Sequence, residues 1–137
     1  MRPATLAEAV DRMRSGEPHH AALAEYLDTF YLEPTPERRL TTLSEEPPLT
    51  GDARLDALAG AIADYLARQY RLPHVPDWAF GPKRFLGRPW HMSPFEGDGM
   101  REFLTFSSPA EFSSRNIFTE ERPLRRARAG LAKVSVG

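Results

Sequence analysis

The stretch that decides the fold runs from Asp52 to Arg71 and reads DARLDALAGAIADYLARQYR. Asp52 is placed to cap the amino end of a helix, and Pro73 is placed to stop that helix just after Leu72. About twenty residues, each rising about 1.5 Å, make a rod about 30 Å long. Its apolar residues share one helical face: Leu55, Leu58, Ala59, Ile62, Leu66 and Tyr70. We therefore predict that the rest of the chain packs around this helix.

The composition is that of one globular domain. The chain has 137 residues, of which 41% are hydrophobic and 27% are charged, so we expect a single domain over residues 1–137. The absence of cysteine excludes disulfides and cysteine-based zinc sites. The amino-terminal stretch has no apolar core of a secretory signal, and no apolar run approaches the length of a membrane span. We expect a cytoplasmic protein that does not enter a membrane.

Three shorter helices are predicted before the long one, over Leu6 to Arg14, over Pro18 to Leu32, and from Pro36 to about Leu43. Thr5 and Glu8 have the spacing of a capping box, and Gly16 is a plausible stop. Thr35 is placed to cap the third helix, with Pro36 at its first position. Residues 1–72 are therefore predicted to form a small helical bundle.

The second part of the chain has a different composition. Six prolines and four glycines fall between Pro73 and Pro109, and seven aromatics lie among them: Trp78, Phe80, Phe85, Trp90, Phe95, Phe103 and Phe106. So many prolines argue against a helix, and so many aromatics argue against disorder. We predict an ordered, extended wrap over residues 73–121, with a possible strand at Met100 to Phe106. Trp78 and Trp90 are predicted to be largely buried against the helices, with their indole N–H groups hydrogen-bonded.

A short helix is predicted near the end of this wrap. Ser108 to Glu111 repeats the capping-box pattern, which predicts a helix ending at Ser114. Asn116 tolerates the left-handed backbone that ends a helix, and Arg115 can reach back to the last carbonyls. The chain then becomes extended at Ile117 and Phe118. With a basic terminal segment at residues 122–137, helical from Leu124 to Val134, the fold is predicted to be mainly α with little or no β.

No catalytic or metal motif stands out. The four histidines lack a second histidine at the helical spacing of a metal site, so no metal or cofactor is expected. One alternative is an enzyme of unknown type with His91 as a base in a cleft. A second alternative is a nucleic-acid-associated or regulatory protein, because basic residues alternate with stacking rings in the wrap. The basic residues of that alternative are Lys83, Arg84, Arg88 and Arg101.

The best candidate for a protein-binding surface is the segment from Phe118 to Leu131. It combines apolar anchors with arginines, which are common at interface hot spots, and it is close to the end of the chain. The candidate contact residues are Phe118, Arg122, Leu124, Arg125, Arg126, Arg128 and Leu131. The partner is predicted to be another protein or a second copy of the chain.

Residues 76–90 and 106–127 also carry a resemblance. The matching positions are Trp78, Pro89, Trp90, Ser108, Pro109, Phe112, Arg115, Asn116, Ile117 and Phe118. The pattern resembles a poorly characterised family of small bacterial proteins that are often encoded beside a nucleotidyltransferase-like partner, in the manner of toxin–antitoxin pairs. The resemblance covers about half of the chain and supplies no catalytic residue. It implies a non-enzymatic, antitoxin-like protein-binding module, which is the function we expect.

Overall fold

The structure is a computed structural model that describes residues 1–92 and 108–119. The described part is mainly helical, as predicted, with one small sheet. The elements are α1 (Leu6–Arg14), α2 (His19–Leu32), α3 (Pro36–Ser44), α4 (Ala53–Gln69), the 3₁₀ turns η1 (Asp77–Phe80) and η2 (Pro82–Arg84), β1 (Trp90–His91), α6 (Ala110–Ser113) and β2 (Ile117–Phe118).

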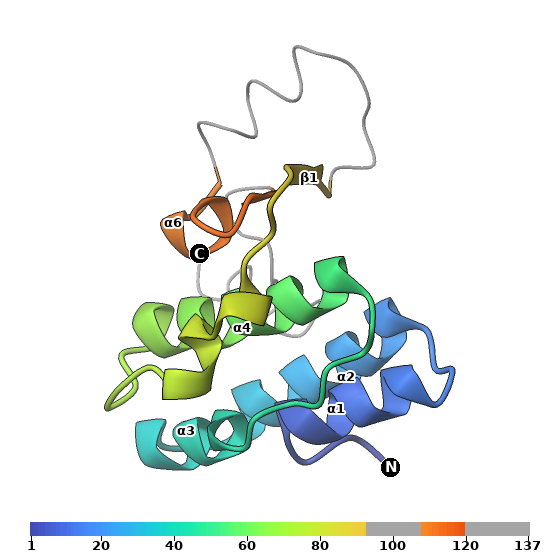
Figure 1. The fold of residues 1–137 in the computed structure, drawn as a ribbon. Helices are drawn as coiled ribbons and strands as arrows, with labels where there is room; N and C mark the ends of the chain where they lie inside the picture. The colour runs from blue at the N-terminus through green and yellow to red at the C-terminus, as the bar shows by residue number, and fades with distance from the viewer. Residues whose placement is uncertain (93–107, 120–137) are drawn as a thin grey trace, which may run out of the picture.

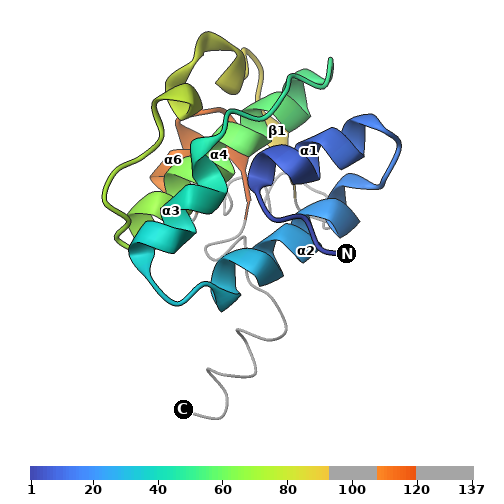
Figure 2. The same ribbon diagram turned by 90° about the horizontal axis from the view of Figure 1, so that it is seen from below.

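Helix α4 lies between two layers. Helices α1, α2 and α3 cover one side of it, while β1 and α6 lie on the other side (Figure 1). The view from below shows the first three helices in front of α4 and α6 behind it (Figure 2). No helix within the described ranges is long and apolar enough to cross a membrane.

The predicted core face of α4 is confirmed. Leu58, Ile62 and Leu66 are 3%, 0% and 0% exposed, and they pack with side chains of the first layer such as Leu6 and Phe30. The opposite side of α4 is buried as well, by the segment that follows the helix. The sequence predicted one buried face, whereas the structure covers both, because the C-terminal part of the chain packs on the second face.

Helix α4 starts at its predicted cap but ends earlier than predicted. The Asp52 carboxylate accepts a hydrogen bond from the Arg54 amide at 2.9 Å. At the other end, Arg71 adopts a left-handed backbone with φ 56°, and the Leu72 amide donates to the Ala67 carbonyl at 2.9 Å. This is the hydrogen-bond pattern of a Schellman motif, which ends the helix at Gln69, before Pro73 can act.

The caps of the first layer are those that the sequence predicts. The Glu8 amide donates to the Thr5 hydroxyl at 3.0 Å, and the Arg38 amide donates to the Thr35 hydroxyl at 3.2 Å. Gly16 has φ +110°, a conformation that side chains rarely adopt, so glycine suits the end of α1. These local bonds fix where the short helices begin and end.

The wrap is ordered over its described part but is not uniformly extended, since η1 and η2 interrupt it. Trp78 is half-buried, which is less than the predicted burial. Its indole N–H donates to the Leu43 carbonyl at 2.9 Å, as predicted. Trp90 is also half-buried, and the Arg54 guanidinium carbon lies 5.4 Å from its ring centroid. No hydrogen bond joins the Trp90 indole to another described residue, so that part of the prediction is not met within the described ranges.

The sheet joins two distant parts of the wrap. Strands β1 and β2 are parallel, with Trp90 opposite Ile117 and His91 opposite Phe118. The Trp90 amide donates to the Asn116 carbonyl at 2.8 Å. The extended backbone at Ile117 and Phe118 was predicted, but its pairing was not. The strand predicted at Met100 to Phe106 and the helix predicted at Leu124 to Val134 lie outside the described residues.

The predicted cap of the short helix is wrong. Helix α6 has Pro109 at its cap position and no side-chain cap bond. The Ser108 hydroxyl instead donates to the Thr119 carbonyl at 2.9 Å and accepts from the Thr119 amide at 2.8 Å. Both hydrogen-bonding roles of the Ser108 hydroxyl are therefore used across the chain, to hold the end of β2.

Candidate functional site

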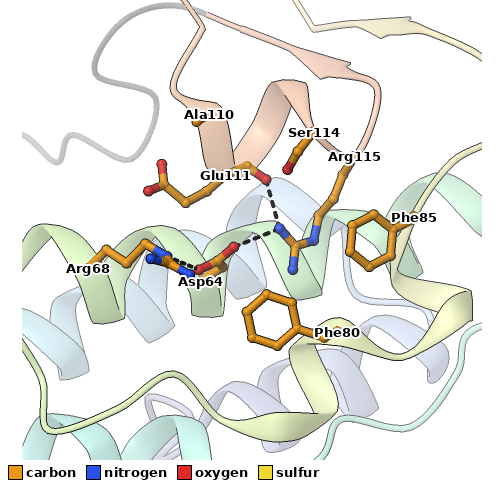
Figure 3. A pocket seen from close by; sticks show the side chains of 8 residues that line it. All are labelled: Asp64, Arg68, Phe80, Phe85, Ala110, Glu111, Ser114 and Arg115. Atoms are coloured by element: carbon orange, nitrogen blue, oxygen red, sulfur yellow. Dashed lines mark hydrogen bonds and ion pairs between the residues drawn. The ribbon is translucent and has the colours of Figure 1, made fainter.

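A buried ion pair lies beneath a pocket that α4 and α6 line together. Arg115 Nη1 lies 2.8 Å from Asp64 Oδ2, and the two side chains are 1% and 5% exposed. The same nitrogen donates to the Glu111 carbonyl at 2.9 Å, and Nη2 donates to the Ala79 carbonyl at 2.7 Å. These bonds supply partners for a charge that would otherwise be costly to bury. They also hold the pocket floor rigidly (Figure 3).

Gly60 lets this floor approach α4 closely. A Cβ at that position would lie 2.7 Å from Arg84 Cβ, 3.1 Å from the Ala79 carbonyl oxygen and 3.3 Å from Arg115 Nε. Arg115 Nε is buried and has no hydrogen-bond partner. Arg84 and Arg115, which are both buried, can therefore lie over α4 only because Gly60 leaves that space open.

Two phenylalanine rings form the aromatic end of the pocket. Phe80 is 47% exposed and Phe85 is 38% exposed. The Arg115 guanidinium carbon lies 5.5 Å and 4.6 Å from their ring centroids, within the range of cation–π contact. The rings thus cover the buried cation with one part of their surface and leave the rest open to solvent.

The other end of the pocket is charged. Arg68 Nε donates to Asp64 Oδ1 at 2.6 Å, and the Arg68 side chain is 57% exposed. The hydrogen bond to Asp64 raises the pKa of Arg68, and the charge of Glu111 adds to that rise. Figure 3 shows Glu111 of α6 and Arg68 of α4 at the same end, away from the rings. Neither the Arg68 terminal nitrogens nor the Glu111 carboxylate has a hydrogen-bond partner among the described residues.

We call this pocket of about 270 Å³ the aromatic groove. Its lining residues are Asp64, Arg68, Phe80, Phe85, Ala110, Glu111, Ser114 and Arg115. The volume lies below the range of roughly 300–1,000 Å³ typical of sites for small molecules and cofactors. The lining contains no histidine and no cysteine, and the described residues contain no group of three potential ligands for a metal ion. The groove therefore combines exposed aromatic surface at one end with charged groups at the other, over a buried ion pair.

The nucleic-acid candidates do not form one exposed set. Arg84 is 1% exposed, and its nitrogens donate to the Asp56 carbonyl at 3.2 Å and the Pro47 carbonyl at 2.7 Å. Its place in that set is therefore corrected: Arg84 holds the wrap against α4. Lys83 and Arg88 are exposed, and Arg101 lies outside the described residues.

His91, the candidate base, is half-buried in β1. Its ring stacks on Phe118, with the centroids 5.1 Å apart and the planes at 22°. A neighbouring surface pocket is lined by His91 with Arg54, Pro89 and Trp90. Among the described residues, that lining has no carboxylate that could orient or charge the imidazole, as a catalytic histidine usually requires.

Only Phe118 of the candidate partner-binding set can be placed. It lies in β2, half-buried and stacked on His91. The other members lie outside the described residues: Arg122, Leu124, Arg125, Arg126, Arg128 and Leu131.

The sequence predicted that Arg115 bonds back to the short helix, and its bond to the Glu111 carbonyl at 2.9 Å confirms this. It predicted neither the groove nor the pairing of Arg115 with Asp64. A signal was present in α4, where Asp56, Gly60, Asp64 and Arg68 recur every fourth residue and so share one face. Two of these are acids that are buried in the structure, at 6% and 4% exposure. Acids on a stripe with glycine, within a helix that is otherwise largely apolar, indicate a face that receives polar partners from elsewhere in the chain. The sequence does not show which residues those partners are.

Comparison with models of protein families, with curated proteins and with solved structures finds no match for this chain.

Proposed function

We propose that this protein is a non-enzymatic protein-binding module and that the aromatic groove is one of its contact sites. The observation that carries the proposal is the exposure of Phe80 and Phe85, at 47% and 38%, on a floor built from a buried ion pair. Large aromatic side chains are normally among the more buried residues of a domain. An exposed pair beside a pocket is better explained by a partner that covers it.

The energetics favour this reading. Binding hot spots are enriched in aromatic residues and arginine, and they lie in well-packed pockets. Here the floor is already ordered, because Arg115 is held by three hydrogen bonds to Asp64, Glu111 and Ala79. A partner would therefore spend little free energy on ordering this surface.

Co-purification followed by affinity measurement tests the proposal. A protein captured by the tagged full chain is purified, and its Kd is measured with the wild type and with Phe80→Ala and Phe85→Ala. Leu32→Ala is the matched control, since Leu32 is 47% exposed but lies at the end of α2. We expect the two phenylalanine variants to weaken binding about tenfold or more and the leucine variant to leave it unchanged. Equal Kd values for all four proteins would reject the groove as the site.

The finer proposal concerns the partner. An antitoxin-like role with a nucleotidyltransferase-like protein is supported by the sequence pattern of the wrap. It is tested by co-expressing this chain with nucleotidyltransferase-like proteins encoded beside its gene and measuring whether the chain binds them and suppresses their activity. If the chain binds none of them, the antitoxin-like role is rejected. The binding-module proposal would still be tested by the affinity measurement above.

The C-terminal segment is a second contact region in this proposal. Deleting residues 122–137 is expected to weaken partner binding while the remaining chain still melts cooperatively. A truncated chain that unfolds would assign this segment to the core, and one that keeps full affinity would place the contact elsewhere. A salt-dependent affinity for oligonucleotides, reduced by changing Lys83 and Arg88, would favour the nucleic-acid alternative instead.

A further inference from the structure

We infer that the aromatic groove takes one large, uncharged apolar side chain of a partner peptide, and that Arg68 and Glu111 hold the main chain of that peptide. This rests on the proposed function, since it specifies what the binding module recognises. The groove has two unlike ends, and each end fits a different part of an apolar residue in a peptide.

The aromatic end selects the side chain. Phe80 and Phe85 offer exposed ring surface, and the alanine at position 110 adds a small apolar wall. The volume of about 270 Å³ suits one large side chain better than a nucleotide or a cofactor. Burying an apolar side chain against these rings is favourable by about 25 cal/mol for each Å² removed from water.

The charges of the described lining residues cancel. The buried pair of Arg115 and Asp64 neutralises itself, and at the charged end Arg68 is accompanied by Glu111. A charged ligand would be attracted by one member of this outer pair and repelled by the other. The complementary group is uncharged and carries both a donor and an acceptor, as a peptide group does.

The hydrogen-bonding capacity agrees with this assignment. Arg68 uses Nε for Asp64, and among the described residues its terminal nitrogens have no acceptor. The carboxylate of Glu111 likewise has no donor there. A peptide carbonyl can accept from Arg68 while a peptide N–H donates to Glu111, so that the side chain between them points to the rings.

A phage-displayed library of random peptides, panned against the full chain, tests the inference. The strongest selected peptide is synthesised, and its Kd is measured with the wild type and with Phe80→Ala, Arg68→Gln and Glu111→Gln at low and high salt. Leu32→Ala is again the control. Phe80 and Arg68 are exposed, and Glu111 is half-buried. In Arg68→Gln, Asp64 keeps Arg115 as its partner. Cooperative melting of each variant is checked first.

The expected result has five parts. The selected peptides share a large apolar residue with no preference for acidic or basic neighbours, and their Kd changes less than about twofold with salt, because no net charge is paired. Phe80→Ala weakens binding about tenfold. Arg68→Gln and Glu111→Gln each weaken it several-fold, and Leu32→Ala has no effect.

Three results would overturn the inference. Selected peptides that need an acidic or basic residue and bind less tightly at high salt would show that the groove recognises charge. Peptides that bind Phe80→Ala as tightly as the wild type would show that their binding site lies outside the aromatic groove. A concentration-dependent dimer abolished by Phe80→Ala would make the occupant a second copy of the chain. The binding-module proposal is tested separately, by the Kd of the captured partner, so the two can fail independently.

Discussion

Arg115 and Asp64 stand 51 residues apart in the sequence, yet they form an ion pair of 2.8 Å in which both side chains are almost fully buried. The pair connects the segment after α6 to the middle of α4. Because Arg115 also reaches the carbonyls of Ala79 and Glu111, one side chain joins three parts of the chain. The second layer of the fold is therefore held by a polar contact as well as by apolar packing.

Removing Arg115 should be costly. Arg115→Ala leaves the carboxylate of Asp64 buried with only the partly exposed Arg68, and breaking a buried pair costs about 3–5 kcal/mol in the free energy of unfolding. Arg12→Ala is the control, because it removes an exposed pair with Glu8 that contributes well under about 1 kcal/mol. Urea unfolding followed by circular dichroism measures both. Similar losses in the free energy of unfolding for the two variants would show that the buried pair stabilises the fold no more than an exposed pair does.

Gly60→Ala should destabilise the protein although alanine is the better helix former by about 1 kcal/mol. The new Cβ would lie 2.7 Å from Arg84 Cβ, so the wrap must move away from α4. We expect a net loss of about 1–3 kcal/mol, the usual cost of overpacking. Gly87→Ala is the control, since no atom lies within 4 Å of its Cβ position. A Gly60→Ala variant as stable as the wild type in urea would show that the wrap can move away from α4 without cost.

Asn116 combines a left-handed backbone, with φ 63°, and a hydrogen bond from its side-chain nitrogen to the Leu86 carbonyl at 2.7 Å. Asn116→Ala loses the hydrogen bond and strains the backbone, so we expect a loss of about 1–3 kcal/mol. Asn116→Gly loses the hydrogen bond but tolerates the left-handed backbone, so it should lose less stability than Asn116→Ala. Thermal and urea unfolding of both variants separate the two contributions. A glycine variant that is less stable than the alanine variant would contradict this division.

Alkaline pH should unfold the protein through its buried tyrosines. Burial raises the pKa of Tyr26 and of Tyr31, and for Tyr31 the hydrogen bond with Tyr70 adds to the rise. The pKa of each buried tyrosine is higher in the folded protein than its value of about 10 in the unfolded chain. Each neutral tyrosine therefore makes its full contribution to stability below about pH 10, and that contribution is lost as pH rises towards the folded pKa. We expect the free energy of unfolding to fall above about pH 10.

Tyrosinate absorbance during a pH titration checks this expectation. The chain has four tyrosines, and Tyr26 and Tyr31 should ionise only together with unfolding. Tyr26→Phe should remove one of these late ionisations while leaving that of Tyr31. All four tyrosines ionising near their ordinary pKa in a protein that keeps its circular dichroism would contradict the burial of these two hydroxyls.

The sequence alone determined the helical layer. Helix α4, the caps at Thr5, Thr35 and Asp52, and the left-handed Asn116 were all readable, because each depends on residues within a few positions. The same holds for the burial of Leu58, Ile62 and Leu66, which follows from helical periodicity. Where local signals competed, the prediction was wrong: Ser108 has the spacing of a cap but bonds to Thr119 instead.

Only the tertiary structure decided which polar residues lie inside. Arg84 looks like a solvent-facing base in the sequence, and Arg115 is predicted only to bond the end of its own short helix. Each is nevertheless 1% exposed, because Gly60 opens a space for them on α4. The aromatic groove exists because the wrap returns to that helix and brings Phe80, Phe85 and Glu111 around one pocket with Arg68. Contacts between residues so far apart depend on the path of the whole chain, and no local spacing records that path.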